Sequence, residues 1–248
     1  SKRSLKLKAR DGIIDDGDDF SGETANRFRK TLEEPPPGAL FLLLGTSLDL
    51  FLSTIQSRCQ LVRFAPLDDV AMETALTAHG INDPGMRRRL IRLGGGSPGQ
   101  ALALADDSLW RFRQAFLEGL AQPRVDSIAL GKQFVELAEQ AGKDGPAQRS
   151  RAGQALGLLI EAFLDLQRLQ AGQPAHSAEP AELPFLTALA QQDEPAKIQA
   201  VLERCLQTEA HVNRYVSLGV TLEGLADALG QIVASGGAAP VRYLGFPA

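Results

Sequence analysis

The chain has 248 residues, of which 44% are hydrophobic, so it can bury the core of one or two domains. Its formal net charge of −4 argues against a protein that binds DNA unaided, because neutralising phosphate charge is what drives non-specific DNA affinity. No apolar run approaches the roughly 20 residues of a membrane-spanning helix, and the basic start is not followed by the apolar region of a signal peptide, so we expect a cytoplasmic protein with no membrane partner.

The first predicted strand lies at residues 12–14, where GIIDD places two β-branched residues directly before carboxylates. Asp15, Asp16 and Asp18 follow this strand. Carboxylates at the end of a buried strand are typical of a Walker B site, in which they hold Mg²⁺ and orient water. A cluster of acidic residues is also typical of a solvated turn, so the spacing alone leaves both interpretations open.

The stretch at 30–59, KTLEEPPPGALFLLLGTSLDLFLSTIQSRC, organises the chain. Its helical pattern is predicted to end at Glu34, because Pro35 lacks an amide donor and clashes with the preceding turn. The apolar run at 39–44 predicts a parallel strand covered on both faces. Thr46 follows that strand at its carboxyl end, where ligands bind in open α/β sheets, although a capped turn also explains a hydroxyl there.

Arg58 ends this stretch, in the turn Ser57-Arg58-Cys59, and another short strand is predicted at 60–64. Spacing does not distinguish a functional arginine here from a solvated one. A phosphate-binding loop of the form G-x-x-x-x-G-K-[ST] does not occur in the sequence. The glycine-rich run at 94–99 has no lysine and is predicted to be a helix end followed by a new helix starting at Ser97. We therefore expect the chain to begin partway through a nucleotide-binding domain.

Helices are predicted throughout the remainder. Three short ones are expected at about 69–79, 84–93 and 97–106, the second with a basic run that we expect to be solvated, Arg87, Arg88, Arg89 and Arg92. From 108 onward apolar stripes predict a helical bundle, with a last helix at 211–234. The fold class is thus α/β plus all-α. Two cysteines and three histidines without metal-binding spacing predict no metal site.

The combination of KTLEEPPP, a strand, a hydroxyl-bearing turn and SRC resembles the AAA+ module of bacterial clamp-loader subunits, the DNA polymerase III gamma/tau and delta-prime group. The motifs match closely from 11 to about 67, and the helical remainder is similar in the order of its elements but not in its motifs. It implies a partial AAA+ parallel-sheet core at 1–66, a helical lid at 67–107, a helical collar for oligomerisation at 108–234 and a tail at 235–248.

The resemblance also implies roles for the candidate site residues. Arg58, within the motif Ser57-Arg58-Cys59, would be an arginine finger acting in trans on ATP and Mg²⁺ bound by a neighbouring subunit. Asp15, Asp16 and Asp18 would be Walker-B-like, and Thr46 and Gln100 sensor-like. Asp16 stands where hydrolysing relatives usually place glutamate, and Gln100 where they have arginine. We therefore expect a degenerate nucleotide site, no cofactor bound by this chain, and no enzyme activity of its own.

The leading interpretation is a delta-prime-type, non-hydrolysing scaffold. It would act in a pentameric ring with gamma/tau and delta subunits, on the sliding clamp and primer-template DNA. Two alternatives stay open: a truncated gamma/tau-like ATPase with its phosphate loop upstream, and a helical interaction module of AAA+ ancestry. Asp16 and Gln100 argue against the first, and the second leaves the SRC motif unexplained.

Overall fold

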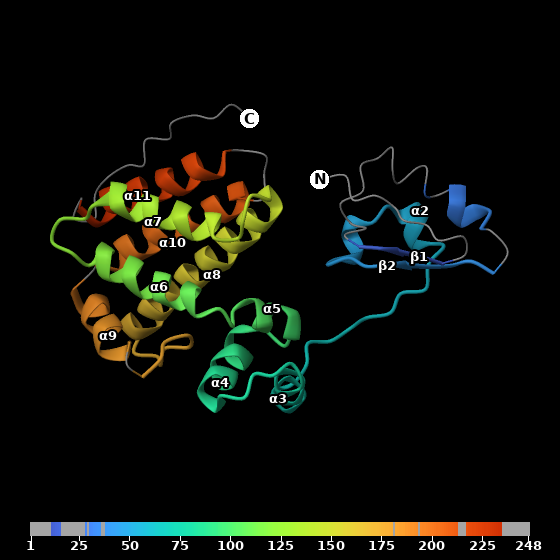
Figure 1. Cartoon of the computed structure of the whole chain (residues 1–248), viewed down its shortest axis with the longest axis horizontal. Helices are drawn as coiled ribbons and strands as arrows, with labels where there is room; N and C mark the ends of the chain where they lie inside the picture. Colours follow the sequence, from blue (N-terminus) through green and yellow to red (C-terminus); the bar gives the residue numbers. More distant parts are fainter. Residues whose placement is uncertain are drawn as a thin grey trace. The chain divides into compact units, whose positions relative to one another are not determined.

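The computed structural model describes residues 11–15, 28, 30–35, 38–180, 182–192, 194–212 and 217–234. Contacts divide the chain into two compact units, Ser1–Ala65 and Pro66–Ala248. The first unit contains a small parallel sheet and the second is helical (Figure 1), which confirms the predicted combination of an α/β part with an all-α part.

The sheet of the first unit pairs β1 (Asp11–Ile14) with β2 (Leu40–Leu43) in parallel. Ile14 lies opposite Leu43, and the carbonyl of Ile14 accepts a hydrogen bond of 2.8 Å from the amide of Leu44. The helical residues at 30–33 end immediately before Glu34 and Pro35, as the missing proline donor predicts. Gly38 then turns the chain into β2 with φ of 75°, in the left-handed region that favours glycine.

One face of this sheet is packed and the other is open. Ile14, Phe28 and Ile55 form a small buried core, and the ring of Phe28 meets that of Phe41 edge-on with centroids 5.6 Å apart. On the opposite face Ile13 is 71% exposed and Leu40 is 58% exposed. The prediction that β2 is covered on both faces is therefore wrong for the described residues, because helical residues pack against only one side.

Residues 60–64 do not form the predicted strand. They are extended without regular structure, and their apolar side chains are exposed, with Phe64 at 90%. A short apolar segment forms a strand only where a neighbouring strand supplies hydrogen-bond partners. None of the described strands lies beside this segment.

The second unit begins with three short helices, α3 (Asp69–Ala78), α4 (Pro84–Leu93) and α5 (Pro98–Ala103). Their N-termini are capped by Asp68, Asp83 and Ser97, whose side chains accept hydrogen bonds from helix amides. A separate buried cluster, Met72, Leu76, Leu90 and Ala101, joins the three helices.

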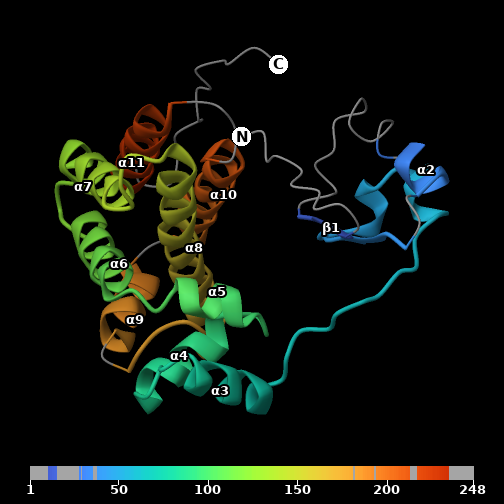
Figure 2. The same cartoon turned by 45° about the vertical axis from the view of Figure 1, so that its right-hand side comes forward.

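The remaining helices form a bundle. They are α6 (Asp107–Leu120), α7 (Ser127–Glu139), α8 (Gly145–Gln170), α9 (Leu183–Gln192), α10 (Pro195–Val212) and α11 (Leu218–Ala234). α8 runs through the middle with α10 beside it, while α7 lies along α11 (Figures 1 and 2). Leucine, phenylalanine and alanine side chains from all six helices make one continuous core. Across the described ranges, we find no helix with the length and apolar character needed to cross a bilayer.

The last two helices correct one boundary. A single helix was predicted from 211 to 234, but α10 continues through Val212 and α11 begins at Leu218. The buried residues Val201, Cys205, Thr208 and Val212 follow one another at helical spacing, so the final residues of α10 belong to its own apolar stripe. Residues 213–216 and the predicted tail at 235–248 lie outside the described residues.

Candidate functional site

Arg58 stands on a short, well-anchored turn in the first unit. A 3₁₀ turn, η2 (Leu48–Leu50), leads into α2 (Ser53–Gln56). Ile55 is 2% exposed and anchors α2 in the small core. The side-chain amide of Gln56 donates to the carbonyl oxygens of Leu48 (3.0 Å) and Phe51 (2.8 Å), which ties α2 to the preceding turn.

The backbone after α2 presents the SRC residues at the surface. The amide of Ser57 donates to Ser53 (3.0 Å), that of Arg58 to Ile55 (3.0 Å), and that of Cys59 to Gln56 (3.3 Å). Because these amides are already paired, the turn needs no neighbouring strand to hold it. Ser57, Arg58 and Cys59 are all exposed. The predicted strand at 60–64 is therefore not what fixes the arginine.

Three contacts to described residues of the first unit hold the guanidinium of Arg58. Nη2 donates to Oε1 of Glu33 at 2.8 Å, and Nη1 donates to the carbonyl of Thr54 at 2.8 Å and to Oγ of Ser57 at 3.3 Å. The ion pair leaves 35% of the Arg58 side chain and 36% of the Glu33 side chain accessible. The contact with Glu33 was not predicted from the sequence, because the two residues lie 25 positions apart in the chain.

The Walker-B-like and sensor-like residues are only partly brought together. Asp15 directly follows β1, and Thr46 follows β2 by three residues, so both lie at the carboxyl edge of the two parallel strands. Both side chains are exposed. Asp16 and Asp18 lie outside the described residues. Among the residues that are described, no group of three or more His, Cys, Asp or Glu side chains is arranged to hold a metal ion.

Gln100 belongs to the second unit, in the first turn of α5. Its amide donates to Oγ of Ser97 at 3.4 Å, so its backbone serves the helix cap. The side chain is exposed and uncharged. An amide in this position can donate a hydrogen bond but cannot neutralise a phosphate charge. The sensor assignment of Gln100 stays a prediction.

Comparison with known proteins identifies the relatives of this chain. A family model described as "DNA polymerase III, delta subunit" matches residues 1–68. The chain is 31% identical over 179 residues to the DNA polymerase III subunit delta' of Escherichia coli (strain K12), which covers 72% of this chain and 50% of that protein. It is 33% identical over 93 residues to the subunit delta' of Bacillus subtilis (strain 168), covering 38% of this chain and 28% of that protein.

The chain is related to the delta-prime subunits of bacterial DNA polymerase III. The expected resemblance is thereby confirmed. The chain spans about half the length of the E. coli delta-prime protein. The family model covers the residues that carry Arg58 and Glu33, so the candidate site lies inside the segment that the relationship supports.

The second unit contains a buried ionic cluster that was not predicted from the sequence. It consists of Arg113, Asp165, Ser177 and Glu182. Arg113 is fully buried on α6; its Nη2 lies 3.1 Å from Oγ of Ser177, and its Nη1 lies 3.5 Å from Oε2 of Glu182. Burial lowers the pKa of the Arg113 guanidinium, and the charges of Glu182 and Asp165 oppose that effect.

Asp165 is the acceptor at the centre of this cluster. It is fully buried on α8 and accepts hydrogen bonds from the amides of His176 (2.6 Å), Ser177 (2.7 Å) and Ala178 (2.9 Å). Ser177 Oγ (2.6 Å) and Arg168 Nη1 (2.9 Å) complete the set. Burial disfavours the charged carboxylate, but these donors outweigh it, and the pKa of Asp165 lies below its ordinary value.

The same region corrects the expectation for the basic run on α4. Arg89 and Arg92 contact Glu179 at 2.9 and 3.1 Å, and Arg89 lies over the ring of Trp110 at 4.3 Å from its centroid. These two side chains are only 23% and 34% exposed, so they are not solvated surface. Glu179 lies some 90 residues away in the chain, and neither composition nor periodicity could indicate it. Together they fasten α4 to the bundle.

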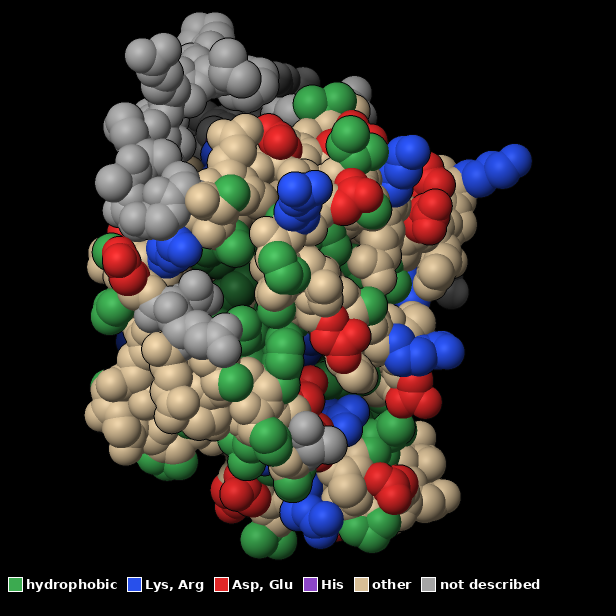
Figure 3. Space-filling view, turned by 90° about the vertical axis from the view of Figure 1, so that its left-hand side faces the viewer, with side chains coloured by type: hydrophobic (Ala, Val, Ile, Leu, Met, Phe, Trp, Pro, Cys, Tyr) green, Lys and Arg blue, Asp and Glu red, His purple; other side chains and the backbone are tan. Residues whose placement is uncertain are grey.

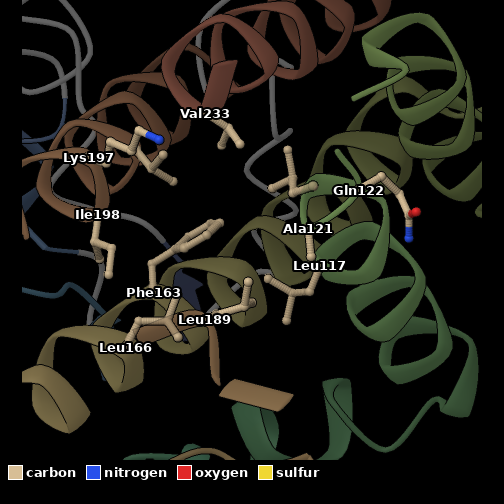
Figure 4. A pocket seen from close by; sticks show the side chains of 11 residues that line it. Leu117, Ala121, Gln122, Phe163, Leu166, Leu189, Lys197, Ile198 and Val233 are labelled. Atoms are coloured by element: carbon tan, nitrogen blue, oxygen red, sulfur yellow. The ribbon is translucent and has the colours of Figure 1, made fainter. Parts of the chain in front are cut away.

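The bundle also contains a hollow of about 110 Å³. Hydrophobic side chains gather in a depression on the face that α6, α9, α10 and α11 contribute to (Figure 3). Figure 4 shows the ring of Phe163 projecting into it, surrounded by Leu117, Leu189, Ile198 and Val233. Most of the side chains that line the hollow are hydrophobic, and Gln122 and Lys197 are its polar members.

Proposed function

We propose that this chain acts as a delta-prime-like subunit of a DNA polymerase III clamp loader, and that Arg58 is an arginine finger for ATP bound by a neighbouring subunit. Two observations support the proposal. The similarity to two delta-prime proteins points to the clamp loader. The arginine of the SRC motif is exposed on a turn whose backbone is anchored in the core, which is the presentation a trans-acting group requires.

An arginine finger stabilises the charge that develops on the transferring phosphoryl group. Its planar guanidinium can contact two phosphate oxygens at once, which the point charge of a lysine cannot do. In Arg58 only the two terminal nitrogens are engaged, through Glu33, Thr54 and Ser57. Within the described part of the chain, Nε makes no hydrogen bond and remains available to a phosphate.

In this proposal the subunit itself does not hydrolyse ATP. The uncharged Gln100 at the sensor position supports that role, and Asp15, Asp16, Asp18 and Thr46 would be remnants of a nucleotide site. ATP and Mg²⁺ would be bound by the neighbour. The proposed partners are the gamma/tau and delta subunits of a pentameric ring, with the sliding clamp and primer-template DNA, in the cytoplasm.

The helical part would then serve as lid and collar. We propose the lid at 67–107 and the collar at 108–234, which would hold the ring together. The continuous apolar core of α6 to α11 gives this region the rigidity that a ring-forming part needs. Several apolar side chains of the bundle also face solvent, including Ile128 at 73% exposure and Val220 at 61% exposure, and these are candidate contacts for other subunits.

The deciding experiment substitutes Arg58 in a reconstituted clamp loader and measures ATP turnover stimulated by clamp and DNA. A finger supplied in trans is worth roughly 10³ to 10⁵ in rate in GTPases, so Arg58→Ala should silence the site that this subunit faces. Total turnover should fall by that site's share, and Arg58→Lys should behave in the same way.

Arg63→Ala is the matched control, since Arg63 is also exposed in the first unit and makes no ion pair among the described residues. It should leave turnover unchanged. If Arg58→Ala loads clamps and turns over ATP like the wild type, Arg58 is surface charge and the finger assignment is wrong.

A further inference from the structure

We propose that Glu33 is a positioning residue for Arg58: its carboxylate fixes the guanidinium in the orientation that meets the neighbour's phosphate. The inference rests on the proposed finger role of Arg58 and adds a second residue to it. The observation that carries it is the 2.8 Å contact between Oε1 of Glu33 and Nη2 of Arg58, which joins two motifs 25 residues apart.

Both ends of this contact are fixed in place. Glu33 is the last helical residue before Pro35, and the next amide, of Glu34, donates to the carbonyl of Lys30 at 3.1 Å. Its neighbour Leu32 packs against the small core. Arg58 stands on the turn that Ile55 anchors in the same core. The carboxylate and the guanidinium therefore meet because one buried cluster positions both backbones.

The donors of Arg58 divide into two sets. A guanidinium has five N–H donors, and three are used by Glu33, the Thr54 carbonyl and Ser57. Among the described residues, the Nε donor and one hydrogen on Nη2 are left without a partner, and these two nitrogens share an edge of the guanidinium. A phosphate can bind to that edge without displacing the internal contacts. The carboxylate thus holds the arginine while leaving it competent to act.

The energetic role of the pair is not folding stability, because exposed ion pairs contribute little to it. Arginine loses much rotamer freedom when it binds a phosphate, and a side chain already held in one orientation loses less. Of the contacts to Arg58, that with Thr54 uses a backbone carbonyl, which a side-chain substitution leaves in place. Of the two side-chain partners, Glu33 is charged and lies at 2.8 Å, whereas Ser57 Oγ lies at 3.3 Å, so Glu33 is the partner whose substitution tests the idea.

The test is a double-mutant cycle in the reconstituted loader, with wild type, Glu33→Ala, Arg58→Ala and the double variant. Glu33→Ala should lower the Arg58-dependent part of kcat by roughly three- to tenfold, with the KM for ATP unchanged. It should have no further effect when Arg58 is already alanine. Glu33→Gln, which keeps an oxygen acceptor, should restore much of the loss.

Glu34→Ala is the control, because Glu34 is exposed beside Glu33 and makes no ion pair among the described residues. It should leave kcat unchanged, and the urea midpoints of all variants should agree. If Arg58→Ala lowers kcat and Glu33→Ala does not, the positioning role is wrong and the finger stands. If Arg58→Ala has no effect, the finger itself is wrong. An increased kcat in Glu33→Ala, or an equal loss in the Arg58→Ala background, would also overturn the positioning role.

Discussion

The chain contains two arginine–carboxylate arrangements that differ mainly in their access to solvent. In the first unit, Arg58 and Glu33 each remain about a third exposed. In the second, Arg113 and Asp165 are fully buried and linked through Ser177. The first arrangement leaves donors available to another molecule, and the second has its charges enclosed by the bundle. Similar charged side chains are therefore accessible to another molecule in the first unit and are part of the buried core in the second.

Burial also changes what each arrangement contributes to stability. Exposed pairs gain little because water and salt screen them and two long side chains must be ordered. In a buried cluster the attraction is stronger, but each charge has lost its hydration, so removing one partner leaves an uncompensated group. Asp165 accepts five hydrogen bonds, which makes it the residue on which the second arrangement depends.

The largest expected effect is the loss of the buried acceptor. Asp165→Ala should lower the free energy of unfolding by about 3–5 kcal/mol, because three amides, Ser177 Oγ and Arg168 lose their acceptor. Urea unfolding of the full chain, followed by circular dichroism, measures this. Asp227→Ala is the control on an exposed helix face and should change the value by less than about 0.5 kcal/mol. Should Asp165→Ala fail to fold, Asp165→Asn provides the measurement, and equal stability of Asn and wild type would contradict the prediction.

A second effect should appear on acidification. Since the folded-state pKa of Asp165 lies below its ordinary value, its contribution is complete above ~4 and is lost as the pH falls through the folded pKa. Asp106 acts in the same window: hydrogen bonding from Ser108 and Arg151 lowers its pKa to about 2. Unfolding free energy should thus decrease as the pH is lowered from ~4 toward 2. Asp165→Asn should flatten that decrease; an unchanged slope would mean that Asp165 does not titrate as described.

A smaller effect is expected at the edge of the buried cluster. Arg89→Ala removes the ion pair with Glu179 and the stacking on Trp110, and should cost about 1–2 kcal/mol. Trp110 is the single tryptophan of the chain, so its fluorescence reports directly on this contact. Arg88→Ala, exposed on the same helix, should change neither stability nor emission. Identical spectra for Arg89→Ala and wild type would show that α4 is not held in this way.

The smallest effect should come from the exposed pair. Glu33→Ala is expected to change the free energy of unfolding by no more than about 0.5 kcal/mol, because the pair is accessible to water. Urea denaturation under the same conditions as for Asp165→Ala gives the contrast directly. A loss above about 2 kcal/mol would mean that the two arrangements do not differ in kind.

Local rules recovered most secondary structure from the sequence. The stop at Pro35, the helix start at Ser97, and the apolar periodicity of the bundle each depend on neighbouring residues alone. The predictions that were wrong concerned features that depend on residues distant in the sequence. Residues 60–64 carry a strand pattern without a described neighbouring strand. The covering of β2 depends on what packs against each face of the sheet, which an apolar run does not specify.

The candidate site divides in the same way. Arg58 was proposed as a site residue from its motif and stays a prediction, whereas its contact with Glu33 depends on how the helix end and the SRC turn meet in space. The sequence gives a weaker indication that Arg113 and Asp165 are buried. Arg113 lies four residues after Leu109 on the buried stripe of α6, and Asp165 three after Ala162 on that of α8. A charge at an apolar position indicates a buried partner but does not identify it.

Asp165 binds the segment that connects α8 to α9, and this contact indicates where the chain can be cut or extended. Residues 171–174 are exposed, and Gly172 there has φ of 71°. Only two residues later the chain is secured by the Asp165 carboxylate at His176, Ser177 and Ala178. A protease that cuts between Gly172 and Gln173, or an epitope inserted there, would leave both flanking segments attached to the bundle. The loop is thus a suitable place to insert a tag in the helical unit.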